Sequence, residues 1–122
     1  MDARQYDQAL KSIRRLVFAL PETVEVEAWG HPTFRAGKKM FAAFGEDDRT
    51  LSLGLKVGFD RQDELLNDDR FFPTPYAARQ GWVSLRIDRD TDWHEVDGLL
   101  REAYRQVALQ RMVKKLESES IG

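Results

Sequence analysis

Two histidines are the residues of this chain best suited to acid–base or ligand chemistry. His31 lies in a Gly-His-Pro turn, where its ring can bond the backbone around Pro32 or act as a ligand or catalytic group. His94 falls in the first turn of the last expected helix, where we expect it to be exposed. A nucleophilic triad needs a Ser, Thr or Cys beside its base, and no G-x-S-x-G motif occurs. We therefore expect a protein that is not an enzyme.

Acidic residues form three short clusters, at 46–48, 60–64 and 88–92. The first is typical of a solvated turn, and none has the spacing of a calcium loop. The last alternates acids but lacks the required glycine and distal glutamate, so a helix-capping turn is favoured. The chain has no cysteine, which excludes disulfides, Cys-ligated zinc and iron–sulfur clusters. No phosphate-loop motif is present, and we expect no metal and no cofactor.

Composition indicates one globular domain over residues 1–122, because 42% hydrophobic and 33% charged residues suffice for a single core. The net charge is −2, so any DNA binding requires a local basic face. The first residues lack the apolar core of a signal peptide, and no apolar run approaches the roughly 20 residues of a membrane span. We expect a cytoplasmic monomer that does not enter membranes.

Helical periodicity is clear at both ends of the chain. Apolar residues recur at three and four spacing from Tyr6 to Leu20, and Pro21 ends this helix. Asp92 with Glu95 forms a capping-box pattern before a second long helix. Its apolar stripe ends at Val107, and the next apolar residues fall on the opposite side, namely Leu109, Met112, Val113 and Leu116. Either the helix breaks near Ala108, or its last turns contact another partner, which leaves a weak dimer open.

Strand patterns fill the centre of the chain. Short runs at 23–29, 33–36, 38–45 and 82–87 surround the best alternation, at 51–57, with a short helix at 61–67. Residues 70–81 are aromatic-rich and predict a loop, with Phe71, Phe72 and Tyr76 packed against the domain. Tight turns between strands favour antiparallel pairing. The predicted fold is α+β, a two-layer sandwich with an antiparallel sheet of about five strands backed by two long helices.

Alternation also predicts a candidate surface. If Leu53 and Leu85 face the helices, the opposite sheet face collects small, basic and aromatic residues, namely Ser52, Gly54, Lys56, Trp82, Ser84 and Arg86. Trp29, Arg35 and Lys39 lie nearby if the strands pair in order. Such a face could bind phosphates and stack bases. The other interpretation is a solvated face with Trp82 covered by the aromatic loop, and Glu25 and Glu27 on a neighbouring strand weigh against nucleic acid.

Several short motifs resemble the MmcQ/YjbR family. They are Gly-His-Pro-Thr-Phe-Arg at 30–35 and Gly-Lys-Lys-Met-Phe-Ala at 37–42, followed by the segments 53–56, 70–71, 75–76, 81–84 and 102–105. Their order and spacing cover roughly residues 6–111. Ala103 departs from the pattern, in which a serine often precedes the tyrosine.

This resemblance implies a CyaY-like (frataxin-like) sheet backed by two helices, and DNA binding attached to a so-called double-wing motif. It implies no catalytic residues. Frataxin-like folds also raise iron binding, which would need an acidic ridge on the first helix. That helix carries mixed charges instead, namely Asp2, Asp7, Lys11, Arg14 and Arg15, so we expect no iron site.

Two functional hypotheses follow. The first is a small binding module for DNA, with contacts from Arg35, Lys39, Lys56, Arg79, Trp82 and Arg86. The second is a protein- or small-ligand-interaction domain that uses a pocket between the aromatic loop and the sheet. That pocket would be lined by His31, Tyr76, Trp82 and Tyr104, a mixture of apolar and polar groups that suits ligand binding.

Overall fold

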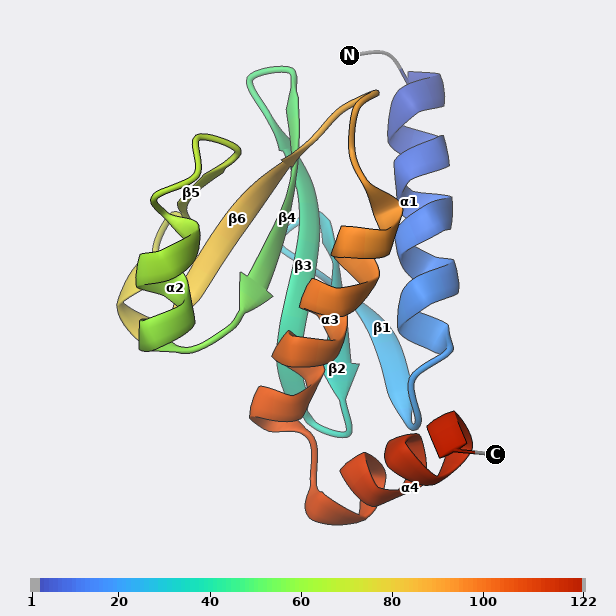
Figure 1. Ribbon diagram of the computed structural model, residues 1–122. Helices are drawn as coiled ribbons and strands as arrows, with labels where there is room; N and C mark the ends of the chain where they lie inside the picture. Colours follow the sequence, from blue (N-terminus) through green and yellow to red (C-terminus); the bar gives the residue numbers. More distant parts are fainter. Residues whose placement is uncertain (1–2, 122) are drawn as a thin grey trace.

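Six antiparallel strands form one sheet in the computed structural model, which describes the backbone of residues 3–121 and the side chains of residues 3–119 (Figure 1). Asp2 therefore lies outside the described residues. The strands are β1 (Thr23–Ala28), β2 (His31–Ala36), β3 (Lys39–Asp47), β4 (Thr50–Lys56), β5 (Phe71–Pro73) and β6 (Trp82–Ile87). Their order across the sheet is β1-β2-β3-β4-β6-β5, so only the last pair departs from chain order.

The two long helices pack on one face of this sheet (Figure 1). They are α1 (Ala3–Phe18) and α3 (Trp93–Val107). The short helix α2 (Phe59–Leu65), the single turn η1 (Ala78–Gln80) and a fourth helix, α4 (Gln110–Ile121), complete the fold. The predicted α+β sandwich is confirmed, with one more strand and one more helix than expected.

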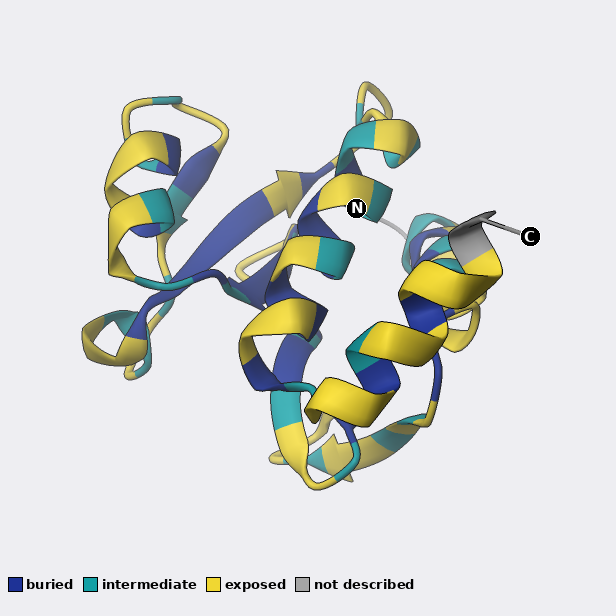
Figure 2. Cartoon of the chain, turned by 60° about the horizontal axis from the view of Figure 1, so that its bottom comes forward, coloured by how far each residue is buried: buried dark blue, intermediate teal, exposed yellow. Residues whose placement is uncertain are grey.

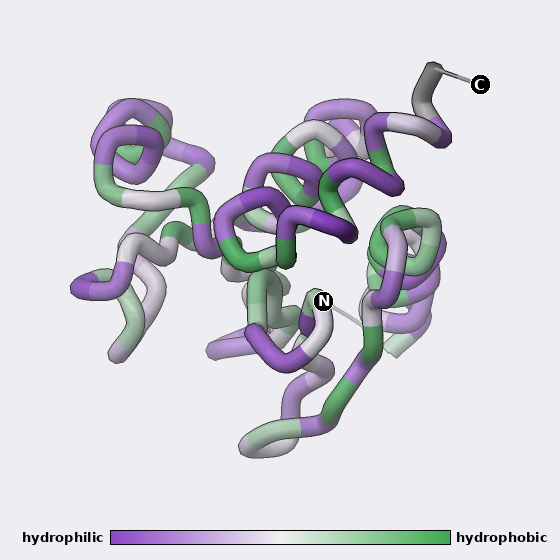
Figure 3. The backbone as a smooth tube through the Cα atoms, turned by 90° about the horizontal axis from the view of Figure 1, so that it is seen from below, coloured by the Kyte–Doolittle hydropathy of each residue, from purple (hydrophilic) through white to green (hydrophobic). Residues whose placement is uncertain are grey.

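The core lies between the sheet and the long helices. Phe44, Leu53 and Leu85 are neighbours in the register of β3, β4 and β6, and each is almost completely buried. The ring of Tyr6 on α1 lies 5.1 Å from that of Phe44. Each long helix combines hydrophobic residues with hydrophilic ones, as Figure 3 shows. The alternating apolar residues of the strands and the helically spaced apolar residues of the helices therefore meet at the same interface, from its two sides.

Part of the predicted aromatic loop is a strand. Residues 71–73 form β5, which pairs with the outer edge of β6. Phe71 lies opposite Leu85 and joins the core, whereas Phe72 lies opposite Ser84 on the other face. The loop prediction was wrong here because only three residues pair, and so short a run gives no alternation that can be recognised in the sequence.

The C-terminal break is confirmed. Ala108 is extended at the end of α3, and α4 begins at Gln110. Met112 and Leu116 of α4 are buried, as the dark bands of α4 in Figure 2 show. A Cβ atom on Gly37 would lie 2.9 Å from the Met112 methyl, so this helix packs tightly under the β2–β3 turn. The second apolar stripe, which led to the dimer hypothesis, is thus largely buried against its own chain.

Tyr104 ties α3 to the turn that follows α1. Its hydroxyl donates a buried hydrogen bond of 2.8 Å to the carbonyl oxygen of Pro21. Its ring meets the Phe41 ring edge-to-face, with the centroids 5.7 Å apart. The same side chain therefore contacts the sheet and satisfies a carbonyl that water does not reach.

We expect Tyr104→Phe to lower the free energy of unfolding by about 1–3 kcal/mol, because it leaves the buried Pro21 carbonyl without its donor. Urea denaturation followed by circular dichroism measures the loss. Tyr76→Phe is the matched control, because Tyr76 is fully exposed. That change should stay within about 0.5 kcal/mol. Equal effects of the two substitutions would show that the Tyr104 hydroxyl does not stabilise the fold.

Arg70 connects the start of β5 to α3. Its guanidinium donates to Asp68 and to Glu95, with shortest distances of 2.6 Å to each carboxylate. Glu95 therefore pairs with Arg70, while Asp92 caps α3 by accepting from the backbone nitrogen of His94 at 2.9 Å. Hydrogen bonds from the side chain and backbone of Arg70 lower the pKa of Asp68 from 3.8 to about 2.

This shift predicts a pH dependence of stability. Because the folded pKa of Asp68 is lowered, its contribution is present above the unfolded value of 3.8 and is lost as the pH falls toward about 2. We expect Asp68→Asn to flatten the decline of thermal stability over that window. Asp69→Asn, which removes a carboxylate next to it that lacks these bonds to Arg70, should leave the decline unchanged. If the melting temperatures of wild type and Asp68→Asn fall in parallel as the pH is lowered, the assignment is contradicted.

Candidate functional site

A row of small side chains crosses the sheet face that α1 and α3 leave uncovered. The register pairs Thr33 with Ala43, Ala43 with Gly54, and Gly54 with Ser84. Because register partners share a face, these four residues form one row across β2, β3, β4 and β6. The row is largely covered, because Thr33 and Ser84 are only 3% and 2% exposed and Gly54 is buried, and taller side chains stand on either side of it.

Those taller side chains include most of the predicted contacts. Lys56 lies opposite Trp82, and Arg86 lies opposite Ser52. Arg35 lies opposite both Val24 and Met40. The register thus places Arg35, Lys56, Trp82 and Arg86 on one face, as the alternation of β4 and β6 predicted.

The two glutamates that weighed against nucleic acid point away from this face. Glu25 is the register partner of the core residue Phe34, and its carboxylate accepts from Arg14 of α1 at 2.7 Å. Glu27 lies two residues further on the same side of β1. Their placement on the candidate face was wrong, because the pairing of β1 with β2 turns Val24 and Val26, which resemble core residues, to that face.

The ionisable strand residues left on the uncovered face are nearly all basic. The described strands place there Asp47, at the tip of the β3–β4 hairpin, and the four residues His31, Arg35, Lys56 and Arg86. We call these four the basic sheet face. Its positive charge contrasts with the net charge of −2 of the whole chain.

Arg35 carries an unsatisfied donor. Its Nε is buried and has no hydrogen-bond partner among the described residues. Buried polar atoms in folded proteins almost always have a partner. A guanidinium offers a planar fork of donors that suits phosphate and carboxylate oxygens. Because this Nε is covered by the protein, it does not present its donor to a ligand on the face.

Arg86 is held in position while it remains exposed. Its guanidinium lies 5.0 Å from the centre of the Phe72 ring and donates to the backbone carbonyl of Asp69. A cation over an aromatic face is stabilised by the ring's quadrupole. Binding of an anion to Arg86 would therefore cost little additional side-chain entropy.

His31 lies on the same face, beside Gly45. A Cβ atom on Gly45 would come within 2.9 Å of the imidazole Nδ1, so glycine leaves the room that the ring occupies. The imidazole is exposed. His31 is the first residue of β2, although the sequence predicted a turn there. No group of three or more His, Asp or Glu side chains within the described residues could hold a metal ion.

Trp82 is covered, as the second interpretation of this face proposed. It is only 7% exposed. The Cβ position of Gly54 lies 3.6 Å from its ring and 3.7 Å from the methyl of Thr74. Thr74 in turn hydrogen-bonds Ser84, with 2.8 Å between the two hydroxyl oxygens. The segment after β5 therefore lies over Trp82, which cannot stack on a base in this conformation.

The rest of this segment projects from the domain. The side-chain amide of Gln62 donates to the carbonyls of Ala78 and Trp82, both at 2.8 Å, and fixes the segment to α2. Tyr76 is fully exposed with a positive φ of 65°, so the prediction that it packs against the domain was wrong. Arg79 is exposed on η1, outside the strands that form the basic sheet face.

Two predicted site residues lie elsewhere. Lys39 is the register partner of Ala36, a core residue, and a bulge at 34–35 shifts it off the basic sheet face. Tyr104 is fully buried on α3, on the helix side of the sheet. The pocket proposed between His31, Tyr76, Trp82 and Tyr104 is therefore not assembled, because the sheet separates Tyr104 from the others.

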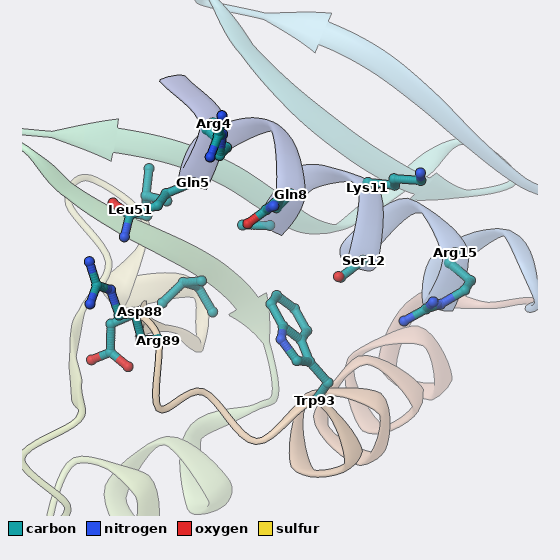
Figure 4. A pocket seen from close by; sticks show the side chains of 12 residues that line it. Arg4, Gln5, Gln8, Lys11, Ser12, Arg15, Leu51, Asp88, Arg89 and Trp93 are labelled. Carbon is teal, nitrogen blue, oxygen red and sulfur yellow. The ribbon is translucent and has the colours of Figure 1, made fainter. Parts of the chain in front are cut away.

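The sequence analysis did not predict a groove between the two long helices. A groove of about 1120 Å³ runs between α1 and the start of α3, and its lining includes Arg4, Lys11, Arg15, Arg89 and Trp93 (Figure 4). The positions 4, 11 and 15 recur at helical spacing, which was visible in the sequence as a polar helix face. That a groove lies beneath them depends on how α3 approaches α1. Within the described part of the chain, no helix is both long and apolar enough to cross a bilayer.

Comparison with known proteins identifies the family. A similar fold occurs in the crystal structure of a Deinococcus radiodurans protein with a DUF419 domain, at 23% identity and a TM-score of 0.71, covering 88% of this chain and 87% of that one. A Pseudomonas syringae protein is 19% identical with a TM-score of 0.55, covering 88% and 99%. No curated protein matches. The YjbR family model matches residues 18–106, most of the chain, and the protein therefore belongs to the YjbR family.

Proposed function

We propose that this domain is a non-catalytic binding module that holds DNA by its phosphate backbone on the basic sheet face. The observation that carries the proposal is the sorting of charge across the sheet. Glu25 faces the helices, where Arg14 neutralises it, whereas Arg35, Lys56 and Arg86 face outward. The DNA binding implied by the family resemblance points the same way.

Three cationic side chains suit a phosphate backbone. Lys56 contributes a flexible charge, and Arg86 contributes one that Phe72 holds in place. Arg35, which is half-buried on the same face, adds a third positive charge.

Base recognition has less support. Trp82 is covered, whereas Trp29 between β1 and β2 and Tyr76 after β5 carry exposed aromatic rings. Contacts to phosphates fix position without reading sequence. We therefore propose binding with little sequence preference and strong dependence on salt, in the cytoplasm and without a cofactor.

We expect wild-type protein to bind a labelled DNA duplex at low salt, with affinity that falls as salt rises. The double variant Lys56→Ala with Arg86→Ala should bind more weakly and reduce the slope of log K against log salt by about two, because two phosphate contacts are lost. Fluorescence anisotropy titrations at several salt concentrations measure both quantities.

The matched control, Lys38→Ala with Lys39→Ala, removes two lysines that do not belong to the basic sheet face. This double variant should keep the wild-type slope. A further variant, Arg86→Lys, retains the charge and tests whether charge alone suffices. No binding at low salt, or equal losses in the two double variants, would reject the basic sheet face as the DNA site.

A further inference from the structure

The strand β1 is an edge of the sheet, with no strand beyond it. It pairs with β2 on one side and ends the sheet on the other (Figure 1). Its link to β2 is the two-residue turn Trp29-Gly30, in which both residues have a positive φ. Such a turn makes Ala28 and His31 a hydrogen-bonded pair, so alternate residues of β1 direct their backbone groups to β2.

The residues between them direct their backbone groups outward. Glu25 lies opposite Phe34, and Glu27 lies opposite Pro32. Proline has no N–H, so it fits a position where β2 does not donate to β1. No described residue hydrogen-bonds the outward N–H and C=O groups of Glu25 and Glu27. The outer edge of β1 therefore offers the donors and acceptors that a further strand needs.

The side chains of β1 add an exposed apolar patch beside this edge. Val24 and Val26 lie on the sheet face that the helices leave uncovered, and both are exposed. Trp29 follows in the turn, with 88% of its surface exposed. Single exposed apolar residues are common on folded proteins, whereas a contiguous group marks a surface that binds a partner.

The conformation of Trp29 points to the same conclusion. Its φ is 52°, in the left-handed region that bulky side chains avoid. In a two-residue hairpin turn this position favours Asn, Asp or Gly. Trp29 neither packs in the core nor suits its turn, so folding does not explain its presence. Tryptophan is enriched among the residues that dominate the binding energy of protein interfaces.

The chemistry of the edge selects the class of partner. Both charged side chains of β1 are glutamates, and they lie on the helix side of the strand. Arg14 pairs with Glu25, whereas Glu27 makes no ion pair with any described residue. A phosphodiester backbone has no N–H donors for the outward carbonyls and would be repelled by Glu27. A polypeptide strand supplies both donors and acceptors.

The same charges disfavour a second copy of β1 as the occupant. Residues directly opposite in an antiparallel pair share a face, so two copies of β1 would place glutamates against glutamates. Opposite charges in these positions stabilise a strand pair. The matching partner strand therefore carries Lys or Arg on the helix side and apolar residues on the other side.

We propose that the outer edge of β1 binds an extended, basic segment of a partner protein as an added antiparallel strand. Its backbone bonds that of Glu25 and Glu27, and its basic side chains lie opposite these glutamates. Its apolar side chains pack on Val24 and Val26, with Trp29 at the end of the strand. This interaction goes beyond DNA binding, because it uses the sheet edge and not the cations of β4 and β6.

A designed peptide tests the proposal. The probe is dye-labelled, about eight residues long, and alternates valine with lysine. A lysine opposite Glu25 or Glu27 occupies a hydrogen-bonded pair, so its N–H points at β1, whereas the valine N–H groups point away. N-methylation of the lysine amides should lower affinity at least about tenfold in anisotropy titrations. N-methylation of the valine amides should leave affinity unchanged.

The variant Trp29→Asn separates binding from stability. Asparagine accepts the positive φ of this turn, so the variant should melt at or above the wild-type temperature in circular dichroism. The variant loses the exposed indole and should bind the peptide at least about tenfold more weakly. A tryptophan that served only the fold would instead lower the melting temperature when replaced.

A charge reversal tests the position of the partner strand. Glu27→Lys should weaken binding of the lysine peptide and strengthen binding of a peptide with glutamates in place of the lysines. The matched control is Asp63→Lys, which makes the same change in net charge at an exposed position of α2. It should leave both affinities unchanged. Lys56→Ala with Arg86→Ala should also bind the peptide normally, so failure here remains distinct from failure of the DNA proposal.

Three results would overturn the proposal. The first is equal binding of the two N-methylated peptides, or no binding of the unmodified one. The second is unchanged affinity in both Trp29→Asn and Glu27→Lys. The third is a dimer in analytical ultracentrifugation that Val26→Lys dissociates, which would assign the edge to a second copy of this chain.

Discussion

The pairing of β4 with β6 is the constraint on which the rest of this structure depends. Leu53 against Leu85 and Leu55 against Val83 place four large side chains under the helices. The alternate positions, including Gly54 and Ser84, then face outward. A slip of one residue would exchange the two faces, expose the leucines and bury Lys56 and Arg86. The register that builds the core therefore also builds the basic sheet face.

Ion pairing explains where free positive charge remains. Arginines at the edges of the fold are matched by carboxylates, as in Arg61 with Glu102, Arg70 with Glu95 and Arg101 with Asp97. Such exposed pairs add little stability individually. These pairs also engage carboxylates at the edges of the fold. Among the cations left without carboxylates, Arg35, Lys56 and Arg86 lie on the basic sheet face, and Arg4, Lys11, Arg15 and Arg89 line the groove between α1 and α3.

The strongly periodic elements were predictable. α1, α3, β4 and β6 follow from spacing alone, and the loss of phase after Val107 predicted the break at Ala108. For these elements the sequence pattern and the tertiary packing require the same faces to be buried. The family resemblance covered nearly the same residues that the family model matches.

Elements whose orientation depends on a neighbouring strand were not predictable. Val24 and Val26 suit a core, yet pairing of β1 with β2 turns Glu25 inward beside Phe34 and turns the valines out. This is tolerable because β1 is an edge strand, and Arg14 reaches across from α1 to neutralise Glu25. No local signal in residues 23–28 contains that information.

The bulge in the β2–β3 pair had a similar effect. It changes the phase of β3, so that Lys39 leaves the face that carries Arg35.

The role of Tyr104 could not be predicted, because a helical stripe shows which residues are buried and not which groups they hydrogen-bond. Its partner, the Pro21 carbonyl, lies 83 positions away in the sequence.

The two cationic surfaces differ in what surrounds the charge. On the basic sheet face, Arg35 stands beside the exposed Val24, and the row of small residues between the cations is largely buried. In the groove between α1 and α3 the cations surround the half-buried Trp93, and Leu51 and Ile87 lie beneath with only 1% and 3% of their surfaces exposed. Because the sheet lies between the two surfaces, an occupant of one does not block the other.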